Sequence, residues 1–123
     1  MRTPLLILTT GTLAVISSAT AKDVTLDADY PGGNVRIVRQ EERTFRIAPD
    51  LRDTAGWWFY FNFRLRAPAN EAVTIAFAQR NPVGVRGPAM SLDAGRTWKW
   101  LGKDAVRKTV SEGHTNWSFQ TAV

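Results

Sequence analysis

Apolar and polar residues alternate along most of the chain after residue 30. The clearest run spans residues 56–66. Its odd positions hold Trp57, Phe59, Phe61, Phe63 and Leu65, and its even positions hold Trp58, Tyr60, Asn62, Arg64 and Arg66. Successive side chains of a strand point to opposite faces of the sheet. The run therefore predicts one strand with an odd-numbered core face, ended by Pro68, which cannot donate to a ladder.

Four shorter runs show the same period of two. Their alternating positions are Val35 and Ile37, then Phe45 and Ile47, then Val73, Ile75 and Phe77, and finally Trp117, Phe119, Thr121 and Val123. Turn-forming or polar segments separate the runs at residues 31–34, 40–42, 68–70, 81–84 and 102–104. No stretch has a convincing helical period. This pattern predicts an all-β fold, an antiparallel, jelly-roll-like β-sandwich of about seven to nine short strands.

The first 21 residues have the layout of a secretory signal peptide. Arg2 precedes the apolar run of residues 4–8, and Ala19-Thr20-Ala21 forms an A-x-A cleavage site. The alternative is a retained membrane anchor, but the apolar core is short against the roughly 20 residues that a spanning helix needs. We therefore expect a β-domain over residues 22–123, exported to the periplasm or the extracellular space and not inserted in the membrane after cleavage.

The charge distribution limits which partners we expect, and the lack of cysteine limits how the core can be stabilised. The chain has 16 Lys and Arg against 11 Asp and Glu, a net charge of +5, but its arginines are scattered and no run of like charge occurs. Nucleic-acid-binding domains usually concentrate their basic residues, so nucleic acid is not an expected partner. The chain has no cysteine. Its five Trp and six Phe are therefore expected to supply the packing that disulfides often supply in small exported domains.

The sequence offers few residues for catalysis. His114 is the only histidine, and it lies in a predicted loop before the last strand. A zinc site needs three or four His, Cys or carboxylate ligands, so no metal site and no cofactor are expected in this chain. The acidic residues fall mainly in turns, where the sequence does not indicate a convergent pair. We expect no enzymatic activity from the chain on its own.

Residues 91–98 read S-x-D-x-G-x-T-W, the Asp-box pattern known from the blades of sialidase propellers. In this pattern Asp93 accepts hydrogen bonds from backbone N–H groups of the turn, and Gly95 permits a positive φ. Trp98 then begins the return strand and is expected to pack back on the core. A propeller needs several blades of roughly 40 to 50 residues, so the pattern predicts a structural hairpin rather than a glycosidase.

Several landmarks occur in an order that points to a known domain. They are residues 29–35 around Pro31-Gly32-Gly33-Asn34, residues 50–61 ending in Trp57-Trp58-Phe59-Tyr60-Phe61, the apolar strand 74–81, the segments 87–91 and 98–102, and Trp117-Ser118-Phe119. Together they resemble the N-terminal β-domain that precedes the catalytic domain in cytosolic-carboxypeptidase-like members of the zinc carboxypeptidase (M14) family. The resemblance covers about residues 30–123.

The resemblance implies a non-catalytic accessory domain that packs against a carboxypeptidase catalytic domain, in cis or in trans. Such a domain shapes the active-site cleft or aids folding. The family's H-x-x-E motif and later zinc-binding His are absent here, so zinc is expected only in a linked catalytic domain. Trp58 and Tyr60 are the candidates for the domain interface, and Arg80, Asn81 and Arg86 are the candidates for facing the cleft. For these residues, buried sheet faces and a solvated turn remain the alternatives.

Two other functions remain open at this stage. One is an exported carbohydrate- or ligand-binding β-sandwich that uses exposed Trp residues beside the Asp-box hairpin. The other is a scaffold without a ligand. The carboxypeptidase-like interpretation itself has two forms, a free-standing relative and the N-terminal part of a longer peptidase.

Overall fold

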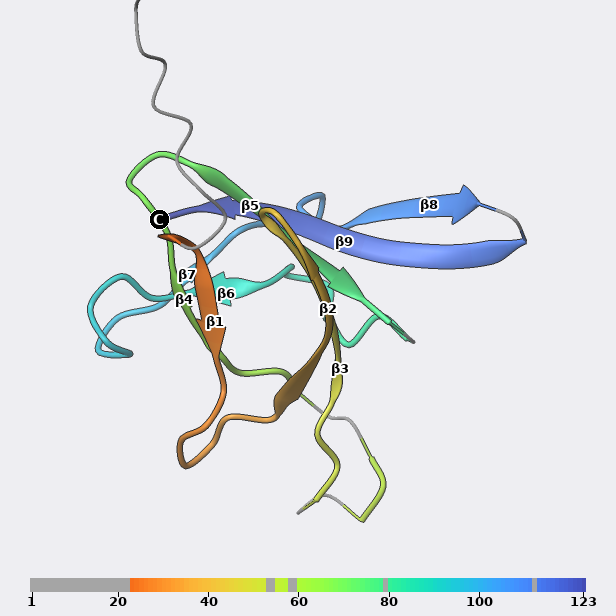
Figure 1. The fold of residues 1–123 in the computed structure, drawn as a ribbon, viewed down its shortest axis with the longest axis horizontal. Helices are drawn as coiled ribbons and strands as arrows, with labels where there is room; N and C mark the ends of the chain where they lie inside the picture. The colour runs from red at the N-terminus through yellow and green to blue at the C-terminus, as the bar shows by residue number, and fades with distance from the viewer. Residues whose placement is uncertain (1–22, 53–54, 58–59, 79, 112) are drawn as a thin grey trace, which may run out of the picture.

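The computed structural model describes residues 23–52, 55–57, 60–78, 80–111 and 113–123. Within these ranges the regular structure is almost entirely strand, and no α-helix occurs. The strands are β1 (Thr25–Asp27), β2 (Val35–Glu41), β3 (Thr44–Pro49), β4 (Arg64–Arg66), β5 (Ala72–Phe77), β6 (Ala89–Met90), β7 (Lys99–Trp100), β8 (Arg107–Ser111) and β9 (His114–Ala122) (Figure 1). The prediction of an all-β, sandwich-like fold with short strands is confirmed.

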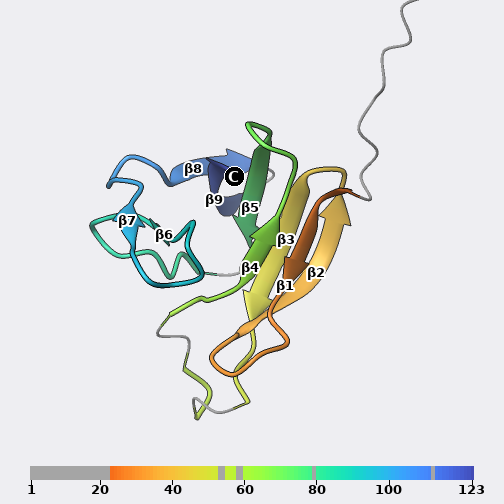
Figure 2. The same cartoon turned by 90° about the vertical axis from the view of Figure 1, so that its left-hand side faces the viewer.

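One large sheet and two small ones form the layers. The large sheet has the strand order β2-β3-β5-β9-β8, and the small sheets are β1-β4 and β6-β7. The large sheet is strongly curved, and both small sheets lie on its concave side (Figures 1 and 2). The β8–β9 hairpin extends beyond the other strands at one end (Figure 1).

Pairing is antiparallel as predicted in every sheet except at one position, where β3 and β5 run parallel. A parallel pair cannot be joined by a tight turn and needs a crossover of a dozen or more residues. Residues 50–71 supply this crossover, because the chain leaves β3, passes through β4 in the smaller layer and returns to β5. The purely antiparallel prediction is therefore wrong at the centre of the large sheet.

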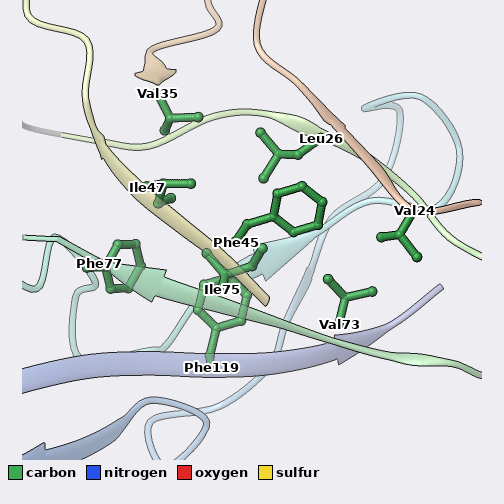
Figure 3. Packing of buried hydrophobic residues seen from close by; sticks show 9 residues of the cluster. All are labelled: Val24, Leu26, Val35, Phe45, Ile47, Val73, Ile75, Phe77 and Phe119. Carbon is green, nitrogen blue, oxygen red and sulfur yellow. The ribbon is translucent and has the colours of Figure 1, made fainter. Parts of the chain in front are cut away.

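The core lies between the large sheet and the β1–β4 layer (Figure 3). Phe45, Ile75 and Phe119 stand opposite one another on β3, β5 and β9. Phe45 and Ile75 have no exposed surface, and Phe119 is 4% exposed. The other members of the buried cluster are Val24, Leu26, Val35, Ile47, Val73 and Phe77. The predicted core positions on β3, β5 and β9 at Phe45, Ile47, Val73, Ile75, Phe77 and Phe119 are confirmed.

The run around residues 57–65 forms much less strand than its alternation predicted. Among the described residues of this run, only Arg64–Arg66 is regular strand. Phe61, Phe63 and Leu65 are half-buried and pack against the core, in agreement with the predicted inward face. Trp57 is 59% exposed, so its predicted core position is wrong. Residues 58 and 59 lie outside the described residues.

A buried side chain explains why residues 60–62 are not part of a sheet ladder. Asn34, which is 5% exposed, donates from Nδ2 to the Tyr60 carbonyl oxygen, and its Oδ1 accepts the Asn62 N–H at 2.7 Å. The Asn34 N–H also donates to the Asn62 carbonyl oxygen at 3.2 Å. Asn34 thus takes the place of a neighbouring strand, and it satisfies backbone groups that would otherwise need ladder partners. This long-range contact joins the turn before β2 to the segment leading into β4.

The same turn requires a glycine at one position. Gly33 donates its N–H to the Tyr30 carbonyl oxygen at 2.9 Å. A Cβ at position 33 would lie 2.0 Å from the Ala28 carbonyl oxygen, so the close approach of these two segments excludes any side chain. The Tyr30 hydroxyl donates to Asn62 Oδ1 at 3.0 Å, which adds a second tie to the same segment.

Strand β2 is less buried than its pattern predicted. Val35 is 6% exposed, but Ile37 is 44% exposed although its predicted position was in the core. Two features account for this: β2 is an edge strand, and its pairing with β3 shifts register between Ile37 and Arg39. A bulge of this kind bends the strand and changes the direction of its side chains. The far end of β2 therefore leaves the core.

The expected signal peptide, residues 1–21, lies outside the described residues. In the ranges that are described, no helix is long and apolar enough to cross a membrane.

Replacing Asn34 by Ala tests how much its hydrogen bonds to residues 60 and 62 stabilise the fold. The change leaves the Tyr60 carbonyl and the Asn62 N–H without their partner, so we expect a loss of roughly 2 to 4 kcal/mol in the free energy of unfolding. Urea denaturation followed by tryptophan fluorescence measures it. The control, Asn116→Ala, removes one long side-chain contact of 3.4 Å to Arg46 and should cost less than about 1 kcal/mol. Equal losses in the two variants would contradict the assigned role.

Candidate functional site

The Ser91 and Asp93 side chains hold the loop between β6 and β7. Asp93 Oδ1 accepts the Thr97 N–H at 2.8 Å, and Asp93 Oδ2 accepts the Thr97 hydroxyl at 2.6 Å. Ser91 Oγ donates to Asp93 Oδ1 at 2.8 Å and accepts the Gly95 N–H at 2.8 Å. Both ends of the loop are therefore tied to one carboxylate, although the loop itself is exposed to solvent.

These hydrogen bonds favour the ionised form of Asp93. The two bonds from Thr97 and the bond from the Ser91 hydroxyl lower the pKa of the Asp93 carboxyl from 3.8 to about 2. Hydrogen bonds donated to a carboxyl group are stronger when the group is ionised, so they favour the charged form. The carboxylate is a structural acceptor in this loop and is ionised at neutral pH.

Trp98 folds over the loop and not into the core. Gly95 has a φ of +86°, a conformation that suits glycine, and the Trp98 indole Nε1 donates to the Gly95 carbonyl oxygen at 3.1 Å. The Trp98 side chain is 59% exposed. The predicted return of Trp98 to the core is therefore wrong. Its ring is nevertheless held in place, because its only polar atom is bonded to the loop.

The pairing of β6 and β7 explains this outward direction. Met90 and Lys99 are opposite each other, and Met90 Sδ accepts the Thr121 hydroxyl of β9 at 3.1 Å. That face of the pair is therefore turned toward the large sheet, and Leu101, two residues after Lys99, packs against the core. Because neighbouring side chains alternate, Trp100 points the other way and is 54% exposed.

Arg86 completes an exposed group of large side chains. Its guanidinium carbon lies 5.8 Å from the centre of the Trp100 ring, within the range of a cation–π contact. We call Arg86, Trp98 and Trp100 the aromatic hairpin face. Trp100 was not among the residues singled out from the sequence, although its position two residues after Trp98 in an alternating strand could have indicated it.

The structure distributes the other predicted site residues over different places. Tyr60 is 49% exposed, and its carbonyl oxygen accepts a hydrogen bond from Asn34. It belongs neither to β6 nor to β7. Asn81 Oδ1 accepts the Val83 N–H at 3.0 Å, so this side chain shapes its own loop. Arg80 is exposed. Trp58, the remaining interface candidate, lies outside the described residues.

The described residues include no group of three or more His, Cys, Asp or Glu side chains close enough to hold a metal ion. His114 is exposed at the start of β9. An open groove of about 260 Å³ lies beside β1 and β2, with Asp27, Asp29 and Arg52 among its lining residues. Asp27 Oδ1 accepts the Asp29 N–H at 2.8 Å, which is a turn-shaping bond.

Comparison of the chain with protein-family models, with curated proteins and with solved structures found no match.

Protonation of Asp93 provides a test of the loop. Because its pKa is lowered in the folded state, its contribution to stability is complete above the ordinary value of 3.8 and is lost as the pH falls toward about 2. We expect the amide resonance of Thr97 to titrate with a midpoint near 2 in NMR spectra. Asp93→Asn should abolish that titration and lower the stability of the loop at neutral pH. A midpoint near 3.8 would contradict the hydrogen-bonded arrangement.

Proposed function

We propose that the chain is a non-catalytic accessory domain that docks onto a protein partner through the aromatic hairpin face. The observation that carries this proposal is the exposure of Trp98 and Trp100 on a hairpin whose loop is fixed by Asp93. Trp and Arg are the residues most enriched where interfaces gain their binding energy. A ring that is already held in place loses little conformational freedom on binding.

The surroundings of this face favour a protein over a small ligand. Val85, next to Arg86, is 89% exposed, and Leu92, in the Asp93 loop, is 73% exposed. Exposed aliphatic side chains beside tryptophans are typical of a surface that another protein covers. The open groove of about 260 Å³ beside Leu26 and a hollow of about 130 Å³ beside Arg46 both lie away from this face.

The resemblance to the N-terminal domain of M14 carboxypeptidases supplies the partner in this proposal. The catalytic domain would hold the zinc ion and carry the peptidase activity, in cis or in trans. This chain would cover an apolar surface of that domain and shape its cleft, with Arg86 at the contact. The proposed route of export is the signal sequence of residues 1–21.

A carbohydrate-binding module is the second candidate, and one observation favours it. Trp98 and Trp100 are two residues apart and both exposed, an arrangement in which two rings can stack on neighbouring sugar units. The loop bond from the Trp98 indole to Gly95 would keep the first ring in place for stacking.

Binding measurements on Trp98→Ala and Trp100→Ala test the docking proposal. Calorimetry would use the purified chain and a zinc carboxypeptidase catalytic domain encoded in the same genome. Each change should weaken the complex by about 2 kcal/mol or more, as at an interface hot spot. Val110→Ala on β8, where the side chain is 69% exposed, is the control and should bind normally. Unchanged binding in both Trp variants, or no complex at all, would contradict the proposal.

Two further measurements separate the candidates. Binding on a glycan array that is lost in Trp98→Ala and Trp100→Ala would favour the carbohydrate module. Zinc and a peptide substrate added to the isolated chain should give no hydrolysis, and turnover there would refute the non-catalytic proposal.

A further inference from the structure

A row of arginines crosses the convex face of the large sheet, opposite the core. The strand register aligns Arg39 of β2, Arg46 of β3, Ala76 of β5, Ser118 of β9 and Arg107 of β8. Their sequence neighbours Phe45, Ile75, Phe77 and Phe119 are buried on the concave side. Because side chains alternate along each strand, the whole row points away from the core. We call it the arginine row.

The positive charge of this row is only partly neutralised. Arg39 and Arg46 are directly opposite each other, and like charges in that position are unfavourable. Glu41 forms an ion pair with Arg39. Arg46 Nη1 donates to the neutral Asn116 Oδ1 at 3.4 Å. Among the described residues no carboxylate forms an ion pair with Arg46 or Arg107. Two guanidinium groups are therefore available to an anion.

The shape of the face suits an extended ligand. A hollow of about 130 Å³ lies at one end, lined by Arg39, Glu41, Thr44, Arg46 and Ala76. Between Arg46 and Arg107 the row consists of the small residues Ala76 and Ser118. Three strand spacings separate the two arginines, about 14 Å between their backbones. Because the side chains between them are small, a polymer lying across the strands can contact both guanidinium groups.

The neighbouring rows carry neutral hydrogen-bonding groups. Thr44, Thr74 and Gln120 are aligned on one side, and Asn116 and Thr109 are paired on the other. Gln120 Nε2 donates to Thr74 Oγ1 at 3.2 Å, which orients its amide. None of these positions is aromatic. Single-stranded nucleic acid is usually bound by stacking on aromatic rings, so this face lacks the groups that favour it.

We propose that the arginine row binds a linear acidic polysaccharide. Carboxylate or sulfate groups of the sugar units would accept hydrogen bonds from Arg46 and Arg107. The Thr, Asn and Gln side chains of the neighbouring rows would bind sugar hydroxyls. This surface uses none of the residues of the aromatic hairpin face, so the proposal does not depend on the docking function.

Affinity electrophoresis and calorimetry with defined polymers test the inference. The probes are polygalacturonate for carboxylates, heparin for sulfates, neutral dextran, and a single-stranded oligothymidylate of matched charge. We expect the chain to bind polygalacturonate or heparin, with an affinity that falls as salt rises, and not to bind dextran. The sugar polymer that binds more tightly identifies which anionic group the site prefers.

Three variants locate the binding site. Arg46→Gln and Arg107→Gln should each lower the affinity for the preferred polymer about tenfold, because each removes a charge-assisted hydrogen bond. Arg66→Gln on β4 makes the same change in net charge at an exposed position of another sheet, and it should change the affinity less than about twofold. Circular dichroism and thermal unfolding check that the variants remain folded.

Three results would overturn the inference. They are the absence of binding to both acidic polymers, an equal loss of affinity in Arg66→Gln, and tighter binding of the oligothymidylate. Trp98→Ala and Trp100→Ala should leave polymer binding unchanged. Loss of polymer binding in these two variants, with Arg46→Gln unaffected, would place the sugar site on the aromatic hairpin face instead.

Discussion

Phe45, Ile75 and Phe119 lie opposite one another on three neighbouring strands, and all three are buried on the concave side of the sheet. A shift of one residue in any of these strands would turn its apolar side chains to solvent and its polar ones to the core. The burial of these side chains therefore fixes the register. It also fixes which residues stand on the convex face, and it is the reason that Arg46 and Ser118 lie in one row.

A second contact orients the smaller layer. Asn34 holds residues 60–62 by their backbone groups, and this placement brings Phe61 and Phe63 against the core. Phe61 packs edge-on against Phe77, with 5.3 Å between the ring centres. The β6–β7 pair is placed by Met90 and Leu101, so that Trp100 is left exposed. Both candidate binding faces are consequences of how the core is filled.

Local alternation was sufficient to predict the strands that pack centrally. Phe45, Val73 and Ile75 are buried because a period of two, flanked by turns, leaves few other arrangements for a central strand. The same rule failed at Trp57. There a buried Asn, more than twenty residues earlier in the chain, binds the backbone just after it, and no local pattern contains that contact. The parallel pairing of β3 with β5 was missed for a related reason, since it depends on a crossover through another layer.

The candidate sites were predictable to different degrees. The residues of the Asp93 loop were apparent from their spacing, because their hydrogen bonds are local. The exposure of Trp98 was not, since it depends on which face of β6–β7 meets β9. The arginine row was not apparent either, because Arg46 and Arg107 are 61 positions apart and only the register brings them into line.

Thiol labelling along β9 tests the register most directly, because the chain has no native cysteine. Single cysteines would be placed at Ser118, Phe119, Gln120 and Thr121, and their rates of reaction with a soluble reagent compared under native conditions. We expect fast labelling at Ser118 and Gln120 and slow labelling at Phe119 and Thr121. The opposite alternation, or similar rates at all four positions, would contradict it.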